Sequence, residues 1–266
     1  MNETRIFRVP KRLLSTASAL VAVSLTHIRY KAGDYFGWVM GWFSLLPVFI
    51  AFGGFITLIL FRRELQTFFF ALGLLICETA NQIIKNIVRE PRPITCGALE
   101  ACESYGWPSG HSQFMSFFAI YLTCLCTFNF TFSANYVKNI TIALPWTLAP
   151  LVMYSRVYLG YHSVTQVFAG ASMGVFLGSF WFWCVHRYFH PKFQQYEKSK
   201  FCRFFRIRDS SHIPDVIGFE YKVSQKMRAN NDLYALFRHK KMLRARGRRR
   251  LRSQPPCHRC RQFKWD

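Results

Sequence analysis

The stretch Ser155-Arg156-Val157-Tyr158-Leu159-Gly160-Tyr161-His162-Ser163-Val164-Thr165-Gln166 places an arginine and a histidine between two strongly apolar runs. Ionisable side chains at the joint of two lipid-embedded helices are costly, so they suggest a functional site by default. The alternative is that Arg156 extends to lipid headgroups and His162 lies at the membrane interface. This stretch alone leaves both interpretations open, and two stretches upstream of it decide between them.

The composition indicates an apolar body followed by a basic tail. The chain has 266 residues, of which 51% are hydrophobic and 18% aromatic, yet its formal net charge is +22. From Pro191 to the end there are 21 Lys and Arg against 6 Asp and Glu, which puts +15 of that charge in the tail. This segregation excludes an ordinary soluble domain.

The apolar body is predicted to contain several membrane spans, because it has successive stretches that approach or exceed the roughly 18 mostly apolar residues of a spanning helix. The fourth span is short and contains Pro145 and Pro150, which would kink it, so it could begin nearer Ala134. The pattern predicts an all-α, polytopic membrane helix bundle of about five transmembrane helices. The predicted spans are Gly37–Leu60, Leu65–Ile87, His111–Phe132, Ile140–Ser155 and Val164–His186.

An apolar segment, Leu13–Leu25, precedes these spans and follows several basic residues. It could be a cleaved signal segment, an interfacial helix or a short sixth span. We favour the interfacial helix, since about thirteen residues are too few to cross a bilayer. The chain then divides into an N-terminal segment (1–36), a transmembrane catalytic domain (37–190) and a basic tail (191–266).

The loop charges predict the orientation. With five spans, the connection Phe61-Arg62-Arg63-Glu64 lies on the same side as the basic tail, and the positive-inside rule makes that side cytosolic. The ends of the second and fourth spans and the starts of the third and fifth then face the lumen or exterior. All the candidate site residues lie at those ends.

The second span closes with a polar face that leads to two cations. Glu78, Asn81, Gln82 and Lys85 are spaced three or four positions apart, and Arg92 follows two turns after Lys85. Both cations could therefore reach one anion. The alternative is that they only anchor to headgroups, but anchoring needs no acidic residue inside the span.

The third span opens with Trp107-Pro108-Ser109-Gly110-His111-Ser112. A helix start with Ser and Gly offers free backbone N–H groups, the positive end of the helix dipole and a hydroxyl, which together suit a phosphate oxygen. Taken alone, Ser109 could be only a helix cap and His111 only a surface imidazole.

Together, the three stretches resemble the three-part signature of the type 2 phosphatidic acid phosphatase superfamily. They are Lys85-x6-Arg92-Pro93, then Pro108-Ser109-Gly110-His111, then Ser155-Arg156-x5-His162, in the family's order and on one predicted membrane side. One position departs from the pattern: the family usually has aspartate four residues after the nucleophilic histidine, where this chain has Gln166.

Within that superfamily the chain is most similar to the dolichyldiphosphatases. The similar stretches span about Leu25–Val223, and the glutamine at position 166 suits that branch. They are Thr26–Asp34, Lys85–Pro93, His111–Met115, Ser155–Leu159 and the tail segment Ile207–Tyr221.

The resemblance implies a phosphoryl transfer, in which a protein mainly positions the reactants and neutralises oxygens. His162 is then the nucleophile that forms a phosphohistidine, and His111 protonates the leaving oxygen and later activates water. The expected phosphate cradle consists of Lys85, Arg92, Ser109, Gly110 and Arg156. Gln166, one helical turn after His162, is expected to orient the imidazole.

No metal or cofactor is expected, because fixed cations can take the place of Mg²⁺ and the acidic residues of these loops lack ligand-like spacing. The expected substrate is a polyprenyl diphosphate lipid, since helix ends place the cradle at headgroup depth and apolar spans can solvate a long tail. Dolichol itself rests on the resemblance alone.

The tail is expected to contact the membrane. Its run Arg244–Arg252 is almost entirely basic and suits anionic lipid headgroups on the cytosolic side. Nucleic-acid binding is disfavoured, because neither a zinc module nor an aromatic platform accompanies the arginines.

Nine cysteines are present. Cys96 and Cys102 share a loop on the predicted luminal side, where a disulfide is permitted. Cys257-His258-Arg259-Cys260 is the only CxxC and has no second pair to complete a zinc site.

Functions from two different classes remain, an enzyme and a non-catalytic membrane protein. The favoured one is a metal-independent phosphatase that converts dolichyl diphosphate to dolichyl phosphate in the endoplasmic reticulum membrane, with a luminal active site, in support of protein N-glycosylation. The alternatives are a non-catalytic membrane scaffold or lipid carrier, or a phosphatase of another lipid phosphate. A histidine pair favours an enzyme, because binding alone needs cations but no nucleophile and acid together.

Overall fold

The computed structural model describes residues 20–22, 28–99, 104–132, 134–213 and 215–229. The chain forms two compact units that divide after Pro214, whereas the sequence places the boundary after His190. The difference arises because Phe193, Cys202 and Ile207 are buried against Leu65 and Val185. The first part of the basic tail is thus continuous with the helical body.

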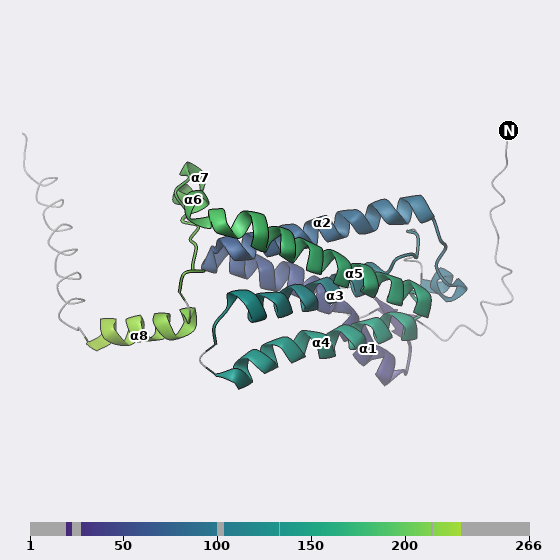
Figure 1. Ribbon diagram of the computed structural model, residues 1–266. Coiled ribbons are helices and arrows are strands. Elements are labelled where there is room, and N and C mark those ends of the chain that lie inside the picture. Colours follow the sequence, from purple (N-terminus) through teal and green to yellow (C-terminus); the bar gives the residue numbers. More distant parts are fainter. Residues whose placement is uncertain (1–19, 23–27, 100–103, 133, 214, 230–266) are drawn as a thin grey trace, which may run out of the picture. The chain divides into compact units, whose positions relative to one another are not determined.

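The first unit is almost entirely helical (Figure 1). Two short strands pair antiparallel, Leu20 opposite Lys31, ahead of the helices. The segments labelled η are π-helical or 3₁₀ turns that extend or connect the α-helices. The elements are β1 (Leu20–Ala22), β2 (Arg29–Lys31), α1 (Tyr35–Val48), η2 (Phe49–Phe55), η3 (Leu58–Arg62), α2 (Leu65–Val88), η4 (Ile94–Leu99), α3 (Gly110–Cys124), η5 (Leu125–Asn129), α4 (Asn135–Tyr158), α5 (Val164–Cys184), η6 (Val185–Phe189), η7 (His190–Lys192), α6 (Phe193–Glu197) and α7 (Lys200–Phe205).

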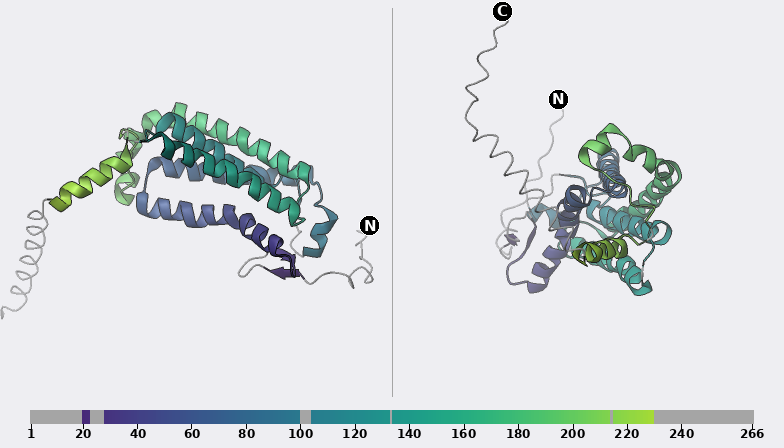
Figure 2. Two further views of the ribbon diagram at one scale, coloured as in Figure 1. Left: turned by 90° about the horizontal axis from the view of Figure 1, so that it is seen from below. Right: turned by 90° about the vertical axis from the view of Figure 1, so that its left-hand side faces the viewer.

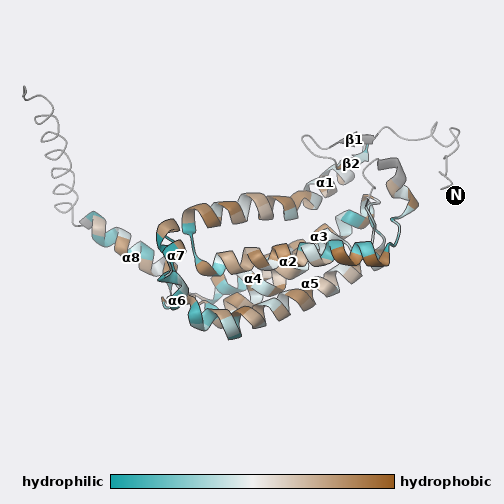
Figure 3. Cartoon of the chain, turned by 90° about the horizontal axis from the view of Figure 1, so that it is seen from above, coloured by the Kyte–Doolittle hydropathy of each residue, from teal (hydrophilic) through white to brown (hydrophobic). Residues whose placement is uncertain are grey.

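Four helical stretches are long and apolar enough to cross a membrane: Tyr35–Arg62, Leu65–Val88, Asn135–Tyr158 and Val164–Glu197. The fourth helix continues through Pro145 and Pro150 and starts near the earlier of its two predicted positions. Apolar residues cover most of α1, α2 and α5, and hydrophilic residues predominate in α6 (Figure 3). The chain is a multi-pass membrane protein with an all-α fold, as predicted.

The third predicted span corresponds to α3 with η5, and it is not among those four stretches of the described chain. It lies inside the bundle, where it packs against α5, α4 and α2. Met115, Ala119 and Tyr121 have no exposed surface. Because protein rather than lipid surrounds this helix, it can carry the polar side chains Ser112 and Gln113, which would be costly on a lipid-facing helix.

The helices α3 and α5 approach closely because glycines line the seam. A Cβ atom at Gly174 would overlap with the carbonyl oxygen of Gln113, and one at Gly170 would overlap with that of Ser109. Small residues allow such backbone contact between membrane helices. The seam holds the start of α3 against the start of α5, where the backbone N–H of Ser109 donates to the carbonyl oxygen of Gln166 at 3.0 Å.

An aromatic core joins α2 to α3 and α5. The rings of Phe70 and Tyr121 stack with their centroids 4.3 Å apart, and Tyr121 meets Phe182 edge to face at 5.7 Å. Such ring pairs contribute about 0.5–1.5 kcal/mol each beyond their buried area. The helices α1 to α5 run alongside one another in all views (Figure 2).

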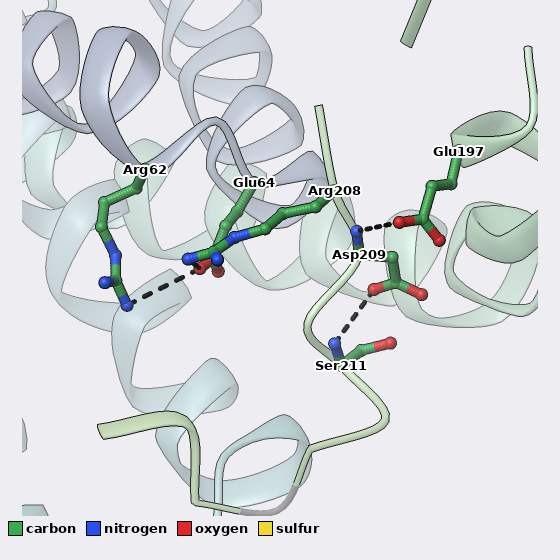
Figure 4. A network of polar contacts seen from close by, with 6 residues as sticks. All are labelled: Arg62, Glu64, Glu197, Arg208, Asp209 and Ser211. Atoms are coloured by element: carbon green, nitrogen blue, oxygen red, sulfur yellow. Dashed lines mark hydrogen bonds and ion pairs between the residues drawn. The ribbon is translucent and has the colours of Figure 1, made fainter. Parts of the chain in front are cut away.

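The basic connection and the start of the tail meet at one end of the bundle (Figure 4). Glu64 pairs with Arg208 at 3.3 Å and with Arg62 at 3.7 Å. The backbone N–H of Leu65 donates to the carbonyl oxygen of Arg208, and that of Asp209 to a carboxylate oxygen of Glu197. This end is opposite to the ends of α2 and α4 and the starts of α3 and α5, which lie together at the other end (Figure 1).

The prediction of an interfacial helix at Leu13–Leu25 is wrong for Leu20–Ala22, which form the strand β1. Backbone pairing with Arg29–Lys31 overrides the apolar pattern there. The remaining residues of that segment lie outside the described part of the chain.

The second unit contains α8 (Val216–Ala229), with the Asp215 carboxylate accepting from the backbone N–H of Gly218. Phe219, Val223 and Met227 are exposed on this helix and recur at helical spacing. The basic run Arg244–Arg252 and the Cys257–Cys260 pair lie outside the described residues.

Candidate active site

A cavity of about 620 Å³ opens between α1, α2 and α3 and reaches the turns at the ends of α2 and α4. One part of its wall is polar and cationic, formed by Glu78, Gln82, Lys85, Arg92, Gly110, His111, Arg156 and His162. The rest of the wall is apolar, formed by Pro47, Val48, Ala51, Phe52, Phe55, Ile56, Ile59, Ala71, Leu74, Leu75 and Phe114. The cavity thus joins a charged pocket to a long apolar surface.

Lys85 and Arg92 come from the end of α2 and the turn after it. The helix ends because Arg89 adopts a left-handed conformation (φ 54°) and Pro91 follows. Lys85 is only 7% exposed. Arg92 donates to the backbone oxygen of Ser104 at 2.9 Å and to its hydroxyl at 2.7 Å. Burial lowers the pKa of the Arg92 guanidinium below its ordinary value, and Tyr161 opposes this shift.

Arg156 lies in the last turn of α4 and is 5% exposed. Its Nη1 donates to the Ser44 hydroxyl at 2.7 Å, and its guanidinium carbon lies 4.1 Å from the centre of the Tyr161 ring. Its buried Nε has no acceptor among the described residues. A buried donor without a partner is costly, so it suits an anion bound in the cavity.

His162 follows a tight turn at Gly160 (φ 78°) and immediately precedes α5. It is 3% exposed, and its Nδ1 lies 3.2 Å from the Oε1 atom of Gln166. Burial, together with Arg156, Arg92 and Lys85, lowers the pKa of the imidazole to about 3, although the Gln166 bond acts in the opposite direction. The imidazole is therefore neutral at physiological pH and keeps a free lone pair.

Gln166 is held by the start of α5. The Ser163 hydroxyl accepts from the Gln166 backbone N–H, and the Gln166 side chain accepts from the Ser163 backbone N–H, which together form a capping box. The Gln166 Nε2 donates to Glu90 Oε1 at 2.8 Å and to the Pro91 carbonyl at 3.0 Å.

At the start of α3, Gly110 and His111 reach the cavity wall but Ser109 does not, as far as the described residues show. Ser109 is fully buried, and its hydroxyl accepts from that of Ser112 at 3.1 Å. The structure brings Lys85, Arg92, Gly110, His111, Arg156 and His162 to one cavity and leaves Ser109 beside Gln166.

Sequence reasoning missed four supporting residues: Ser44, Glu90, Ser104 and Tyr161. Glu90 and Tyr161 lie within the motif stretches, so proximity in sequence could have marked them. Ser44 gives no such signal, because it meets Arg156 across 112 positions.

Cys96 is disulfide-bonded. Its predicted partner, Cys102, lies outside the described residues. Within the described chain, no three His, Cys, Asp or Glu side chains are grouped as metal ligands would be.

Comparisons with known proteins agree with this architecture. Residues 66–190 match the model of the PAP2 superfamily. Lipid phosphate phosphatase gamma of Arabidopsis thaliana is 49% identical over 217 residues, which cover 80% of this chain and 95% of that protein. Dolichyldiphosphatase 1 of Mus musculus is 40% identical over 76% of this chain and 87% of its own, and that of Dictyostelium discoideum is 39% identical over 80% and 94%. The chain therefore belongs to the PAP2 superfamily of lipid phosphatases, in the family that includes the dolichyldiphosphatases.

Proposed function

We propose that this protein hydrolyses dolichyl diphosphate to dolichyl phosphate and inorganic phosphate, through a phosphohistidine at His162. The observation that carries the proposal is the two-part cavity, in which a neutral buried histidine lies among three cations and an apolar wall extends away from them.

In the first step, the lone pair on Nε2 of His162 attacks the terminal phosphorus. The bond from that phosphorus to the bridging oxygen breaks, and the electron pair leaves with dolichyl phosphate. Lys85, Arg92 and Arg156 neutralise the oxygens of the transferring group, with the Arg156 Nε as a free donor. His111 supplies a proton to the leaving oxygen.

In the second step, His111 accepts a proton from a water molecule that attacks the phosphohistidine. The P–N bond breaks, the electron pair returns to Nε2 of His162, and inorganic phosphate leaves. The cations act in both steps because charge on the equatorial oxygens persists throughout. These fixed charges support a reaction that proceeds without a metal ion.

The apolar wall supports a substrate with a long hydrocarbon tail. Val48 ends α1, Phe52 lies in η2 and Ile56 directly follows η2. They face the cavity with Leu74 and Leu75 of α2. A polyprenyl tail that reaches these residues from the bilayer is already out of water, so the apolar wall accommodates it without the cost of desolvating polar groups.

We further propose that the site faces the lumen of the endoplasmic reticulum. The cationic cavity and the basic residues Arg62, Arg63 and Arg208 lie at opposite ends of the bundle, and basic connections favour the cytosolic side. The names of the relatives from Mus musculus and Dictyostelium discoideum support a dolichol-linked substrate.

A second candidate is a phosphatase of lipid monophosphates. It is favoured by the 49% identical relative, whose name is lipid phosphate phosphatase. The same cradle would serve, but the leaving group would be an alkoxide and would need the proton from His111 more strongly.

The experiment is phosphate release by the purified full chain in detergent, with a metal chelator present. Dolichyl diphosphate, dolichyl phosphate and phosphatidic acid are compared, with the His162→Asn variant as the matched control. We expect the diphosphate to have the highest kcat/KM. A higher value for either monophosphate would favour the second candidate, and no release from any of the three would favour a scaffold or carrier.

A further inference from the structure

Two kinds of partner surround the side-chain amide of Gln166, and they decide which way it points. Glu90 Oε1 and the Pro91 carbonyl can only accept, and both lie within 3.0 Å of the Gln166 Nε2. The Ser163 backbone N–H can only donate, and it lies 3.3 Å from Oε1. If the amide were reversed, its oxygen would face the two acceptors and its NH₂ group would face the Ser163 backbone N–H. Only the observed orientation therefore satisfies all of these hydrogen bonds.

This orientation determines the proton position on His162. Because the Gln166 Oε1 can only accept, the Nδ1 atom 3.2 Å away must carry the hydrogen. The Nε2 atom of the imidazole is then the unprotonated one. The amide therefore presents the nucleophilic nitrogen to the cavity in the form that can attack.

The surrounding chain holds Glu90 in this position. Glu90 is preceded by the left-handed Arg89 and followed by Pro91, and its own carbonyl accepts from the Gly106 N–H at 2.8 Å. A Cβ atom at Gly106 would lie 2.6 Å from the Gln166 Nε2. The loop before α3 thus closes over the amide and keeps it against Glu90.

In the described chain, the ionisable groups that line the cavity with His162 are Glu78 and four cationic or neutral side chains. Lys85 comes from α2, Arg92 from the turn after it, His111 from α3 and Arg156 from α4. Arg156, Arg92 and Lys85 disfavour positive charge on the imidazole, yet attack through Nε2 places positive charge on the ring. The superfamily's usual aspartate would offset this charge, and this chain has a neutral amide in its place.

We propose that Glu90 is a positioning residue that supplies, through Gln166, the negative charge that position 166 lacks. Its carboxylate polarises the amide, strengthens the hydrogen bond to Nδ1 and stabilises the phosphorylated imidazole. The proposal rests on the nucleophilic role proposed for His162. It assigns the orientation of the nucleophile to a relay of three side chains, Glu90, Gln166 and His162.

The test uses the full chain in detergent, dolichyl diphosphate as substrate, and the variants Glu90→Gln, Gln166→Glu and the double exchange of the two. We expect Glu90→Gln to lower kcat about 10- to 100-fold, the range found when the carboxylate behind a metal-bound histidine is removed. The KM should stay within about twofold, because Glu90 is not part of the cavity wall in the described chain.

The pH profiles separate a charge relay from simple packing. In Gln166→Glu, two carboxylates within hydrogen-bond distance must share a proton, so the pair gains a raised apparent pKa. Activity should then fall as the pH rises through that value, where the unchanged protein shows no such decline. In the double exchange, the carboxamide at position 90 donates to the carboxylate at position 166, so the decline should vanish and kcat should exceed that of both single variants.

The proposal is overturned if Glu90→Gln keeps the original kcat, or if the kcat of the double exchange does not exceed that of both single variants. Glu197→Gln removes a carboxylate at the opposite end of the bundle and is the matched control. Trapping the phosphorylated protein with labelled substrate separates the two proposals. Absence of phosphohistidine in the unchanged protein would refute the proposed function, whereas its presence with failed rescue would refute only the role of Glu90.

Discussion

His162 shows how burial controls chemistry at the scale of single residues. The side chain lies among Lys85, Arg92 and Arg156, and desolvation and these cations together keep it neutral. A neutral imidazole is a nucleophile, whereas an imidazolium is not. The same cations that we propose to hold a phosphate therefore also keep the proposed attacking nitrogen unprotonated.

The first prediction concerns the histidine pair. His162→Asn should lower kcat at least about 1,000-fold, as loss of a nucleophile does elsewhere, and should abolish phosphoenzyme labelling. His111→Asn should slow turnover less with a diphosphate than with a monophosphate, because a phosphate leaving group depends less on protonation than an alkoxide does. Rapid-quench labelling with both substrates measures this, and full activity in His162→Asn would refute the assignment.

The second prediction concerns stability against pH. In the folded protein the pKa of His162 is about 3, against about 6.5 in an unfolded chain. Between these values the unfolded state binds more protons, so the stability that neutral His162 provides is complete above pH 6.5 and is lost as the pH falls toward 3.

Thermal unfolding in detergent from pH 7 to pH 4 tests this prediction. His162→Asn, which cannot titrate, should lose less thermal stability over this range than the unchanged protein. Equal losses in both proteins would contradict the lowered pKa.

The third prediction concerns Gln166. Gln166→Ala should lower kcat through misorientation of His162, because the amide contacts both Nδ1 and the Ser163 N–H. Gln166→Asp should remain active and raise the basicity of His162, provided that the shorter side chain reaches the ring. Their pH–rate profiles measure both effects, and a profile for Gln166→Ala like that of the unchanged protein would make Gln166 a bystander.

At the scale of elements, the seam between α3 and α5 determines the geometry of the site. Gly170 lies against Ser109 and Gly174 against Gln113, so the two helix starts are held in contact. Asn81 of α2 joins the same seam through Gln113 at 2.7 Å, and Gln113 continues to the Cys77 carbonyl at 2.8 Å. A buried polar chain therefore links α2 to α3 next to the cavity.

The fourth prediction tests this seam. Gly174→Val should destabilise the protein by about 1–3 kcal/mol or more, the usual cost of overpacking, because the added carbons meet backbone rather than flexible side chains. Gly53→Ala is the matched control, since a Cβ atom there meets nothing within 4 Å. Thermal unfolding in detergent measures both, and an unchanged midpoint for Gly174→Val would show that the seam is looser than described.

At the scale of the whole molecule, the basic connection and the start of the tail lie at one end of the helical unit, and the cationic cavity lies at the other. Glu64 and Arg208 tie the start of the tail to the connection between η3 and α2. The cavity and its cations lie at the other end. This separation gives the membrane orientation a direct test.

The fifth prediction is that a glycosylation acceptor placed in the loop from Cys96 to Cys102 is modified in cells, and that one placed in the basic tail is not. The reason is that Cys96, in the described part of this loop, packs in one cluster with Tyr161 beside Arg156, at the end of the bundle opposite the basic connection. Gel mobility before and after glycosidase treatment measures this. Modification of the tail alone would mean that the proposed orientation is inverted.

Local properties of the sequence were enough to predict the long helices and the cationic and histidine residues of the candidate site. Hydropathy over about 20 residues predicts a span regardless of its neighbours, so four predicted spans match long apolar helices. Lys85, Arg92, His111, Arg156 and His162 could be chosen because their order and spacing resemble a known signature. The sequence predicts Gln166 beside His162 on the assumption that both share a helix face. The contact is present, but His162 precedes α5 and the capping box at Ser163 holds the amide.

Only the tertiary structure decided what supports these residues. Ser44 meets Arg156 across 112 positions and Glu90 meets Gln166 across 76, and such contacts depend on how helices pack rather than on local sequence. The Ser109–Ser112 contact and the pairing of Leu20–Ala22 with Arg29–Lys31 are closer in sequence, but hydropathy and motif spacing indicated neither of them. A residue type states which bonds a side chain can make, but the packing of distant segments determines which partner is within reach.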